Sequence, residues 1–382
     1  MSEVDELIQQ LCPDGVEYKS LQQCTKKIEN IKWSSTSKEY QYIDLSSVDR
    51  ETNRITGTQT IIADNAPSRA QQIVKANDIL LGTTRPMLKR YCMIDDNYDS
   101  QICSTGFCVL RANELVLPGW IYHQITSTDF FAYVEKNQKG ASYPSISDAN
   151  VKAYTIPVPP LEIQREIVRI LDQFTELTAE LTAELTARRE QYEYYREKLL
   201  REYGIKTKLL GELCKTITTG KLNANAMVED GEYPFFTCDA KPYRIDKYAF
   251  DTEAILVSGN GSQVGHINYY SGKFNAYQRT YVLANFQGVD TKYLLFYLKA
   301  YLREYIMIHS KKGSVPYITL PMLQNFKVVI PNCSEQSRII SILDRFDTLC
   351  NDLTSGLPAE IEARRKQYEY YRDKLMTFKA KT

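Results

Sequence analysis

Two loops of the sequence carry side chains that could contact the base edges of DNA. Residues 83–90 read TTRPMLKR, contain no acidic residue and follow a segment that we expect to be a strand. Residues 259–265 read GNGSQVG and follow a similar segment. Arginine and lysine read guanine, whereas asparagine and glutamine read adenine. The candidate DNA contacts in these loops are Arg85, Lys89, Arg90, Asn260, Ser262 and Gln263.

A second pair of loops suits contact with phosphates. Residues 139–142 read KGAS and residues 311–314 read KKGS, at matching places in the two halves of the chain. Lysine and free backbone N–H groups bind phosphate without reading sequence. The candidates are Lys139, Ser142, Lys311, Lys312 and Ser314. The competing interpretation of each single loop is a solvated hairpin turn.

Other kinds of site are disfavoured. The loop at 259–265 has neither the GxGxxG nor the GxxxxGKS/T spacing of a nucleotide site. Pro159-Pro160 lacks the flanking residues of a methyltransferase motif. The nine cysteines form no CxxC pair and the three histidines are scattered, which argues against a metal site. We therefore expect no catalytic residue, no metal and no cofactor in this chain.

Composition limits the possible partners. The 382 residues include 47 basic and 47 acidic side chains, so a DNA-binding face has to concentrate its positive charge locally. No apolar run is long enough to cross a membrane, and the first ten residues are acidic rather than a signal peptide. A cytoplasmic location is expected.

The elements that would position these loops are two long helices. Residues 161–203 contain no glycine or proline and carry a heptad pattern with a stutter at the tandem TAEL units, Thr178–Leu185. A helix of this length spans roughly 65 Å. It is too long and too one-sided for a core helix, and instead resembles a rod that packs against one partner helix.

The partner helix lies in the same chain, because the sequence repeats. IVRILDQF at 167–174 matches IISILDRF at 339–346, and RREQYEYYREKL at 188–199 matches RRKQYEYYRDKL at 364–375. The second copy is about one helical turn longer between these blocks, and Ser355-Gly356-Leu357-Pro358 predicts a break there. Upstream, SYPSIS at 142–147 matches SVPYIT at 314–319. A globular segment followed by a long helix thus occurs twice.

Local patterns predict the smaller elements. A short helix is expected over 3–11, and Asn332 with Glu335 predicts a capping box at the start of the second long helix. Strands are expected at 40–45, 73–74, 79–81, 91–94, 107–110, 235–237, 254–258, 266–270 and 280–284, and helices at 120–127, 129–137, 291–299 and 301–309. Because the ends of a domain often lie close together, the long helices should be antiparallel and related by a pseudo-two-fold axis.

The most nearly identical part of the repeat is the block RRxQYEYYRxKL. Tyrosine and arginine are typical of interface hot spots, and two copies of one surface suit two copies of one partner. The predicted partner-binding residues are Arg188, Arg189, Tyr192, Tyr195, Arg364, Arg365, Tyr368 and Tyr371. The alternatives are a solvated helix face with intrahelical ion pairs and direct DNA contact by these arginines.

The two helix blocks, the TAEL tandem and the segments before each helix resemble the specificity subunit of a type I restriction-modification system, with the tandem typical of the IC subclass. The resemblance covers nearly the whole chain and implies an α+β protein: target recognition domains at 1–158 and 204–331, and conserved spacer helices at 159–203 and 332–382. It also implies a bipartite DNA target and a non-catalytic role.

The partners implied by the resemblance are two methyltransferase subunits and two motor-nuclease subunits. Adenine N6 methylation would use S-adenosylmethionine on the methyltransferase subunits, and cleavage would use ATP and magnesium on the others. Two departures from symmetry stand out: the second helix lacks the tandem, and Arg85-Pro86 stands where the second loop has Gly261-Ser262. Because of the second departure, the DNA contacts of one loop cannot be carried across to the other position by position. The competing hypotheses are a coiled-coil scaffold whose heads bind proteins and a self-contained methyltransferase.

Overall fold

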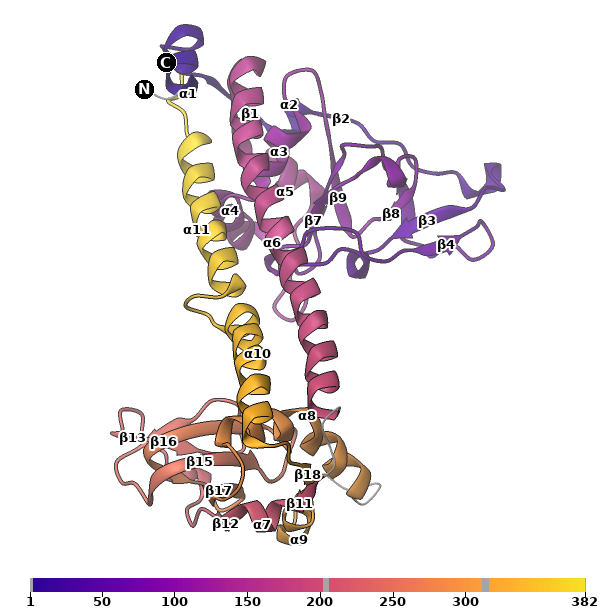
Figure 1. The fold of residues 1–382 in the computed structure, drawn as a ribbon. Helices are drawn as coiled ribbons and strands as arrows, with labels where there is room; N and C mark the ends of the chain where they lie inside the picture. Colours follow the sequence, from indigo (N-terminus) through magenta and orange to yellow (C-terminus); the bar gives the residue numbers. More distant parts are fainter. Residues whose placement is uncertain (1–2, 202–205, 311–315, 382) are drawn as a thin grey trace. The chain divides into compact units, whose positions relative to one another are not determined.

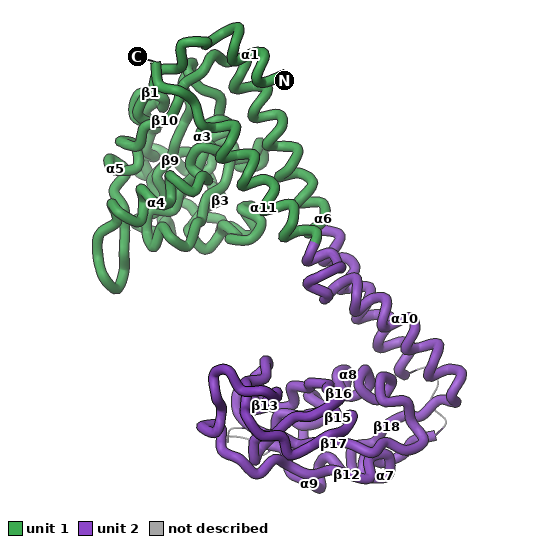
Figure 2. The backbone as a smooth tube through the Cα atoms, turned by 90° about the vertical axis from the view of Figure 1, so that its left-hand side faces the viewer, with its two compact units in different colours: residues 1–182, 360–382 green, residues 183–359 purple. Residues whose placement is uncertain are grey.

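The computed structural model describes residues 3–201, 206–310 and 316–381. The chain forms two compact units (Figure 2). Unit 1 contains residues Met1–Thr182 and Glu360–Thr382, and unit 2 contains Ala183–Ala359. The boundaries cut both spacer regions, so each unit combines a globular head with parts of two helices from distant places in the sequence. The predicted division into two heads and two spacers is not tested by this split and stays a prediction.

The head of unit 1 is built from small antiparallel and mixed sheets. Two four-stranded sheets have the orders β2-β9-β6-β7 and β4-β3-β8-β5, and β1 pairs with β10. The strands are β1 (Glu17–Ser20), β2 (Thr25–Lys26), β3 (Tyr40–Ile43), β4 (Gln59–Ile61), β5 (Ala70–Ile73), β6 (Ile79–Gly82), β7 (Tyr91–Met93), β8 (Ile102–Ser104), β9 (Phe107–Ala112) and β10 (Thr155–Val158). Central strand β6 is buried along its whole length, which explains its continuous apolar sequence.

Helices cover this head and connect it to the spacer. They are α1 (Glu3–Leu11), α2 (Leu21–Cys24), α3 (Pro118–Ile125), α4 (Thr128–Asn137) and α5 (Asp148–Ala153). Trp120 of α3 is fully buried, and its indole N–H donates to the carbonyl of Pro157 at 3.0 Å. The same core includes Ile163 and Ile167 of the long helix and Met376 near the end of the chain. One apolar core therefore joins the head to both spacer segments of unit 1.

The head of unit 2 is a six-stranded sheet with the order β12-β17-β15-β16-β13-β14, beside a β11-β18 pair. The strands are β11 (Thr207–Leu209), β12 (Cys214–Thr219), β13 (Tyr233–Phe236), β14 (Tyr243–Ile245), β15 (Phe250–Ser258), β16 (Ile267–Ala276), β17 (Thr280–Phe286) and β18 (Lys327–Val329). Its helices are α7 (Leu210–Leu213), α8 (Thr291–His309) and α9 (Leu320–Gln324). Tyr293 of α8 is fully buried and donates to the carbonyl of Val329, as Trp120 does to Pro157 in unit 1.

The spacer helices are α6 (Leu161–Arg201), α10 (Cys333–Asn351) and α11 (Leu357–Leu375). Figure 1 shows α11 antiparallel to the first half of α6, and α10 antiparallel to its second half. Phe174 stacks on Tyr371 with ring centroids 5.5 Å apart in unit 1, and Phe346 stacks on Tyr195 at 5.9 Å in unit 2. The two contacts use the same repeat positions with the copies exchanged, as expected for a duplicated helix that pairs with its own copy.

Several expected elements are confirmed. They include the short helix over 3–11, the break in the second spacer between Asn351 and Leu357, and the N-cap of α10, where the Asn332 side chain accepts from Glu335 N–H. The fold class, α+β with two heads joined by long helices, is also confirmed.

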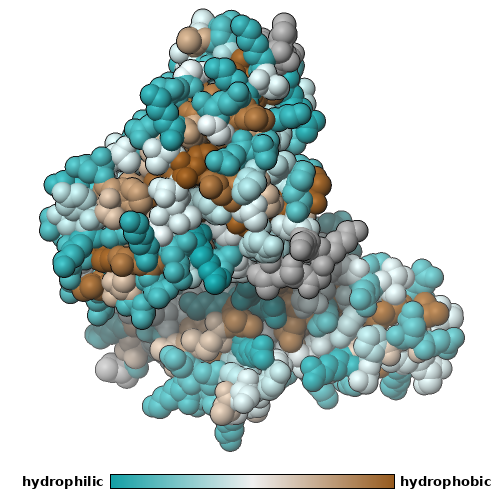
Figure 3. Space-filling view, turned by 90° about the horizontal axis from the view of Figure 1, so that it is seen from below, coloured by the Kyte–Doolittle hydropathy of each residue, from teal (hydrophilic) through white to brown (hydrophobic). Residues whose placement is uncertain are grey.

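Two details were wrong. The helices expected at 291–299 and 301–309 form the single helix α8, because no breaker separates them. The Glu335 carboxylate pairs with Arg338 instead of completing a capping box. Within the described part of the chain, no helix has the length and hydropathy needed to cross a membrane. The face drawn in Figure 3 carries its hydrophobic side chains in separate groups among hydrophilic ones.

Candidate nucleic-acid interface

The basic loop of unit 1 joins β6 to β7 and is held open by a short 3₁₀ turn over Pro86–Leu88. The Gly82 N–H donates to the Arg90 carbonyl at 2.7 Å and closes the base of the loop. Arg85 and Lys89 flank the turn, and both have a left-handed backbone, with φ of 49° and 52°. Both side chains are exposed at the rim of the loop.

The second predicted loop of this head lies directly against the first. The Arg85 N–H donates to the Pro144 carbonyl at 2.7 Å, and the Ile146 N–H donates to the Thr83 carbonyl at 3.0 Å. The Arg85 guanidinium lies over the ring of Tyr143, 4.4 Å from its centroid. Lys139 and Ser142 are exposed beside this pair. The structure thus brings Arg85 next to the segment that carries Lys139 and Ser142. The other two predicted base contacts lie elsewhere, because the Lys89 ammonium is over the Phe131 ring, 4.9 Å from its centroid, and the Arg90 Nε is buried.

The loop of unit 2 joins β15 to β16 and has the same backbone. The Ser258 N–H donates to the His266 carbonyl at 2.9 Å, as Gly82 does to Arg90, and the Ile318 N–H donates to the Gly259 carbonyl at 2.8 Å, as Ile146 does to Thr83. Gly261 and Gly265 have φ of 83° and 79° and take the positions of Arg85 and Lys89. The two loops thus share their backbone arrangement while their side chains differ, and the expectation that DNA contacts do not carry over position by position stays a prediction.

The two heads differ in the residues that they place at the left-handed positions of these loops. A non-glycine residue with positive φ costs on the order of 1 kcal/mol, and such residues cluster at functional sites. Unit 2 relieves this cost with glycine at both positions, whereas unit 1 keeps a cation at both. Unit 1 therefore carries backbone strain at Arg85 and Lys89 that unit 2 avoids.

Unit 2 has a hollow beside its loop. It is lined by Thr219, Gly259, Asn260, Gln278, Arg279, Tyr281, Pro316, Tyr317 and Ile318. The Cys238 thiol donates to the Asn260 side-chain oxygen at 3.2 Å, while Ser262 and Gln263 are exposed on the loop. The predicted contacts Lys311, Lys312 and Ser314 lie outside the described residues.

Two residues of these surfaces were missed by sequence reasoning. Tyr143 lies within a segment recognised only as part of the repeat, although an exposed aromatic next to a basic loop could have been noticed. Arg279 is a single arginine in a turn before β17 and gives no sequence pattern.

The predicted partner-binding block divides into packed and exposed residues. Tyr192 is only 7% exposed and belongs to the core of unit 2, and the Tyr368 hydroxyl contacts His123 inside unit 1. Arg189 donates to the Cys350 carbonyl at 3.3 Å. Arg188 bonds Gln191 and Glu184, and Arg364 bonds Gln367 and Glu360 in the same way, while Arg365 is exposed.

An aromatic pair is repeated on the surface of this block. Tyr194 meets Tyr195 edge to face at 5.4 Å and 76°, and Tyr370 meets Tyr371 at 5.3 Å and 76°. Tyr194 and Tyr370 are 62% and 63% exposed. Neither was among the predicted partner-binding residues, although the repeated sequence contains both. Each unit therefore presents the same exposed aromatic surface.

Comparison with known proteins places these features in a family. A family model described as the type I restriction modification DNA specificity domain matches the chain twice, over residues 13–190 and 203–363. The chain belongs to this type I restriction-modification DNA specificity family. The resemblance found in the sequence is therefore confirmed, and with it the assignment as a specificity subunit, the non-catalytic component of such systems.

Individual relatives agree with the assignment as a specificity subunit. A Haemophilus influenzae chain assigned as a type I restriction enzyme specificity subunit is 33% identical over 298 residues, which cover 71% of this chain and 74% of the relative. The specificity subunit of an Escherichia coli type I restriction enzyme is 36% identical over 262 residues, covering 61% and 65%.

A solved chain from a study of type I complex assembly and conformational transition has a TM-score of 0.66 and 26% identity, with 96% and 98% of the two chains covered. The S subunit of Mycoplasma genitalium, at 17% identity, shares the fold with a TM-score of 0.62, covering 95% of this chain and 96% of its own.

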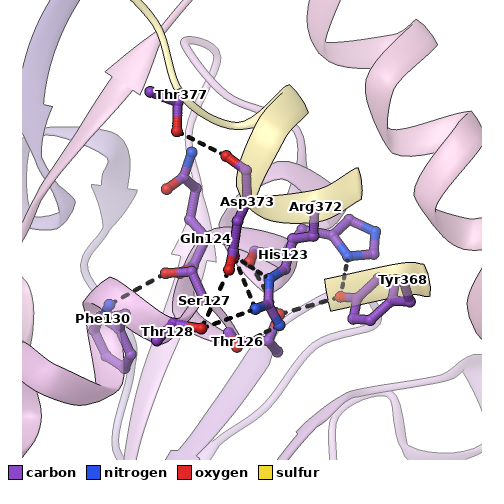
Figure 4. Close-up of polar contacts among 10 residues, drawn as sticks. All are labelled: His123, Gln124, Thr126, Ser127, Thr128, Phe130, Tyr368, Arg372, Asp373 and Thr377. Atoms are coloured by element: carbon purple, nitrogen blue, oxygen red, sulfur yellow. Dashed lines mark hydrogen bonds and ion pairs between the residues drawn. The ribbon is translucent and has the colours of Figure 1, made fainter. Parts of the chain in front are cut away.

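In this specificity subunit, a polar network fixes α11 to the head of unit 1 (Figure 4). His123 of α3 is fully buried and bonds the Tyr368 hydroxyl through Nδ1 and the Asp172 carboxylate through Nε2, both at 2.9 Å. Arg372 of α11 is also buried and donates to the Thr126 carbonyl at 2.8 Å. Burial lowers the pKa of His123 below its ordinary value of 6.5, although the hydrogen bond to Asp172 opposes this shift.

Replacing His123 with phenylalanine is expected to reduce the acid sensitivity of unit 1. A histidine with a lowered pKa stays neutral in the folded state while the unfolded chain takes up a proton, so stability is full above pH 6.5 and falls as the pH drops below it. The equivalent position in unit 2 is Phe296, so phenylalanine is compatible with this packing. Thermal unfolding at about pH 8 and about pH 5.5 should show a smaller difference in Tm for the variant.

The exposed His309 provides the matched control, because His309→Phe removes a histidine that is not buried. An unchanged Tm difference for His123→Phe would show that His123 does not cause the acid sensitivity.

Proposed function

We propose that this specificity subunit recognises a bipartite, asymmetric DNA target, with the head of each unit reading one half-site. The observation that carries the proposal is the pair of loops, 83–90 and 259–265, which share one backbone arrangement but present different side chains. A shared loop backbone that presents different side chains suits two heads that read different half-site sequences in the same manner. With a DNA target, we also propose a cytoplasmic location.

We further propose that the repeated spacer block docks two methyltransferase subunits. The support is the duplicated aromatic surface of Tyr194 and Tyr370, which offers the same contact twice. The docked subunits would supply S-adenosylmethionine and the active site for adenine N6 methylation. Two motor-nuclease subunits with ATP and magnesium would add restriction. The residues of this chain would contribute binding and orientation only.

The direct test is reconstitution of the chain with the methyltransferase subunits of its host. Methylated adenines mapped on a DNA library should fall in two short half-sites separated by an unspecified gap. Methylation at a single continuous site, or at sites unrelated to sequence, would contradict the proposal. A complex that binds DNA without any sequence preference would favour the scaffold interpretation instead.

Removing the cations of the basic loop should weaken DNA binding and its salt dependence. Each phosphate contact contributes about 0.9 to the slope of log K against log salt. Arg85, Lys89 and Arg90 changed together to alanine should lower that slope by about one to three. Binding titrations of the complex at several salt concentrations measure it.

The control replaces Lys27, Lys32 and Lys38, which are exposed and lie outside this loop, so the change in net charge is the same. An unchanged slope in the loop variant would exclude its cations from DNA contact.

A further inference from the structure

Each head has an arginine in one of two neighbouring loops, but the loop that carries it differs between the heads. In unit 1 the Thr83 N–H donates to the Gly106 carbonyl at 2.8 Å, and in unit 2 the Gly259 N–H donates to the Arg279 carbonyl at 2.9 Å. These bonds join the loop after β6 or β15 to the turn before β9 or β17. Unit 1 has arginine in the loop, Arg85, and glycine in the turn. Unit 2 has glycine in the loop, Gly261, and arginine in the turn.

Space around the glycines explains this difference. A Cβ at Gly106 would lie 3.1 Å from the Leu45 side chain, so the turn of unit 1 is too crowded to carry a long side chain easily. A Cβ at Gly261 would meet nothing within 4 Å, so an arginine there would bear only the left-handed backbone strain that Arg85 also bears. Glycine relieves this strain in the loop of unit 2, and the neighbouring turn carries the arginine instead.

Both arginines are available for a ligand. Arg85 and Arg279 are exposed, and neither makes an ion pair with any carboxylate of the described residues. Arg85 rests on the Tyr143 ring. Arg279 lines the hollow together with Asn260 and Tyr317, and its backbone is fixed because its carbonyl accepts from Gly259. Each arginine thus lies on a hydrogen-bonded backbone and beside an exposed tyrosine. Each belongs to one of the two segments that follow β6 or β15 and precede β9 or β17.

We propose that Arg279 reads a guanine in the half-site of unit 2, at the place that Arg85 occupies in unit 1. This inference rests on the proposed function, because it assigns one base contact within a DNA half-site. The arginine fork donates two hydrogen bonds to O6 and N7 of guanine in the major groove, the commonest specific contact to a base. The planar guanidinium holds these two donors in a fixed fork, whereas the ammonium of lysine is a point charge on a flexible stem.

The experiment uses the full chain in complex with its methyltransferase subunits and a DNA library with both half-sites randomised. Arg279→Gln should reduce the preference for guanine at one position of one half-site by roughly 10- to 100-fold and leave the other half-site unchanged. Arg85→Gln should change the other half-site only. Lys273→Gln is the matched control, because Lys273 is exposed on β16 of the same sheet. It lies opposite Asp251 in the strand register, and Asp251 is about 20 Å along β15 from the loop.

A second variant keeps the test valid if Arg279→Gln folds poorly. Gly261→Arg combined with Arg279→Gly moves the arginine to the loop, as in unit 1, and should recover a guanine preference in the same half-site. An unchanged profile for Arg279→Gln, or weaker binding without a change in base preference, would overturn the inference and leave the proposed function standing. No sequence preference in the unaltered complex would instead refute the proposed function.

Discussion

One additional Thr-Ala-Glu-Leu unit inserted after Leu185 is expected to change the gap between the two methylated half-sites. The tandem lies inside the continuous helix α6, and the boundary between the compact units falls within it. Its threonines are satisfied within the helix, since Thr178 and Thr182 donate to the carbonyls of Phe174 and Thr178. An added unit can therefore extend the helix without new tertiary contacts.

The size of the change follows from helix geometry. Four residues add about 6 Å and about 40° of rotation to a helix. Against a rise of roughly 3.4 Å per base pair and about 10 base pairs per turn, the gap should grow by one or two base pairs. Methylation mapping with the reconstituted complex should show loss of the original spacing and gain of a longer one, with both half-sites unchanged.

A Gly-Ser-Gly-Ser insertion at the same place is the control, because it has the same length but breaks the helix. This control should abolish methylation at any defined spacing. If the TAEL insertion mutant methylates only the original spacing, α6 does not set the distance between the half-sites.

Loss of the exposed tyrosines Tyr194 and Tyr370 is expected to prevent assembly with the methyltransferase subunits. Exposed tyrosines that become buried at an interface are typical hot spots, each worth about 2 kcal/mol or more, or roughly 30-fold in affinity. Alanine at both positions should weaken binding by roughly 1000-fold if the two sites are separate and both are needed. Size-exclusion chromatography and titration calorimetry measure the loss.

These tyrosines separate docking from folding better than the arginines of the same block. Reversing the charge of Arg188 and Arg189 should also block assembly, but Arg189 bonds the Cys350 carbonyl and its loss could loosen the spacer. Tyr269→Ala is the control, since Tyr269 is 41% exposed on β16. Full assembly by the double tyrosine variant would place the docking surface elsewhere.

Long-range repetition made the large features predictable. Matching blocks around 167–174 and 339–346, and the Gly356-Leu357-Pro358 break, identify two antiparallel spacers, because helix periodicity is local and each block repeats nearly unchanged. Short strands such as β2, β8 and β14 were missed, because their pairing partners rather than their own residues define them. The helix α8 was divided at residue 300 although its sequence contains no glycine or proline that would break it.

The candidate site was only partly predictable for a related reason. Basic side chains and glycines reveal the loops, so Arg85, Lys89 and Asn260 could be chosen from sequence. The proximity of 83–90 to 139–146 depends on backbone hydrogen bonds between segments far apart in the chain. The importance of Arg279 depends on a crowded glycine in the other half of the protein, which no local pattern reveals.

The stretches of chain that make up each unit determine the order in which the units can fold during synthesis on the ribosome. Unit 2 is one continuous stretch, so it can complete its core as soon as Ala359 has emerged. Unit 1 begins with the first residues translated, but its core also includes Leu375, Met376 and Phe378. Its apolar face must stay uncovered while the second half of the chain is made. The part translated first is thus the last to mature, and in that interval it is the part most exposed to aggregation and to chaperones.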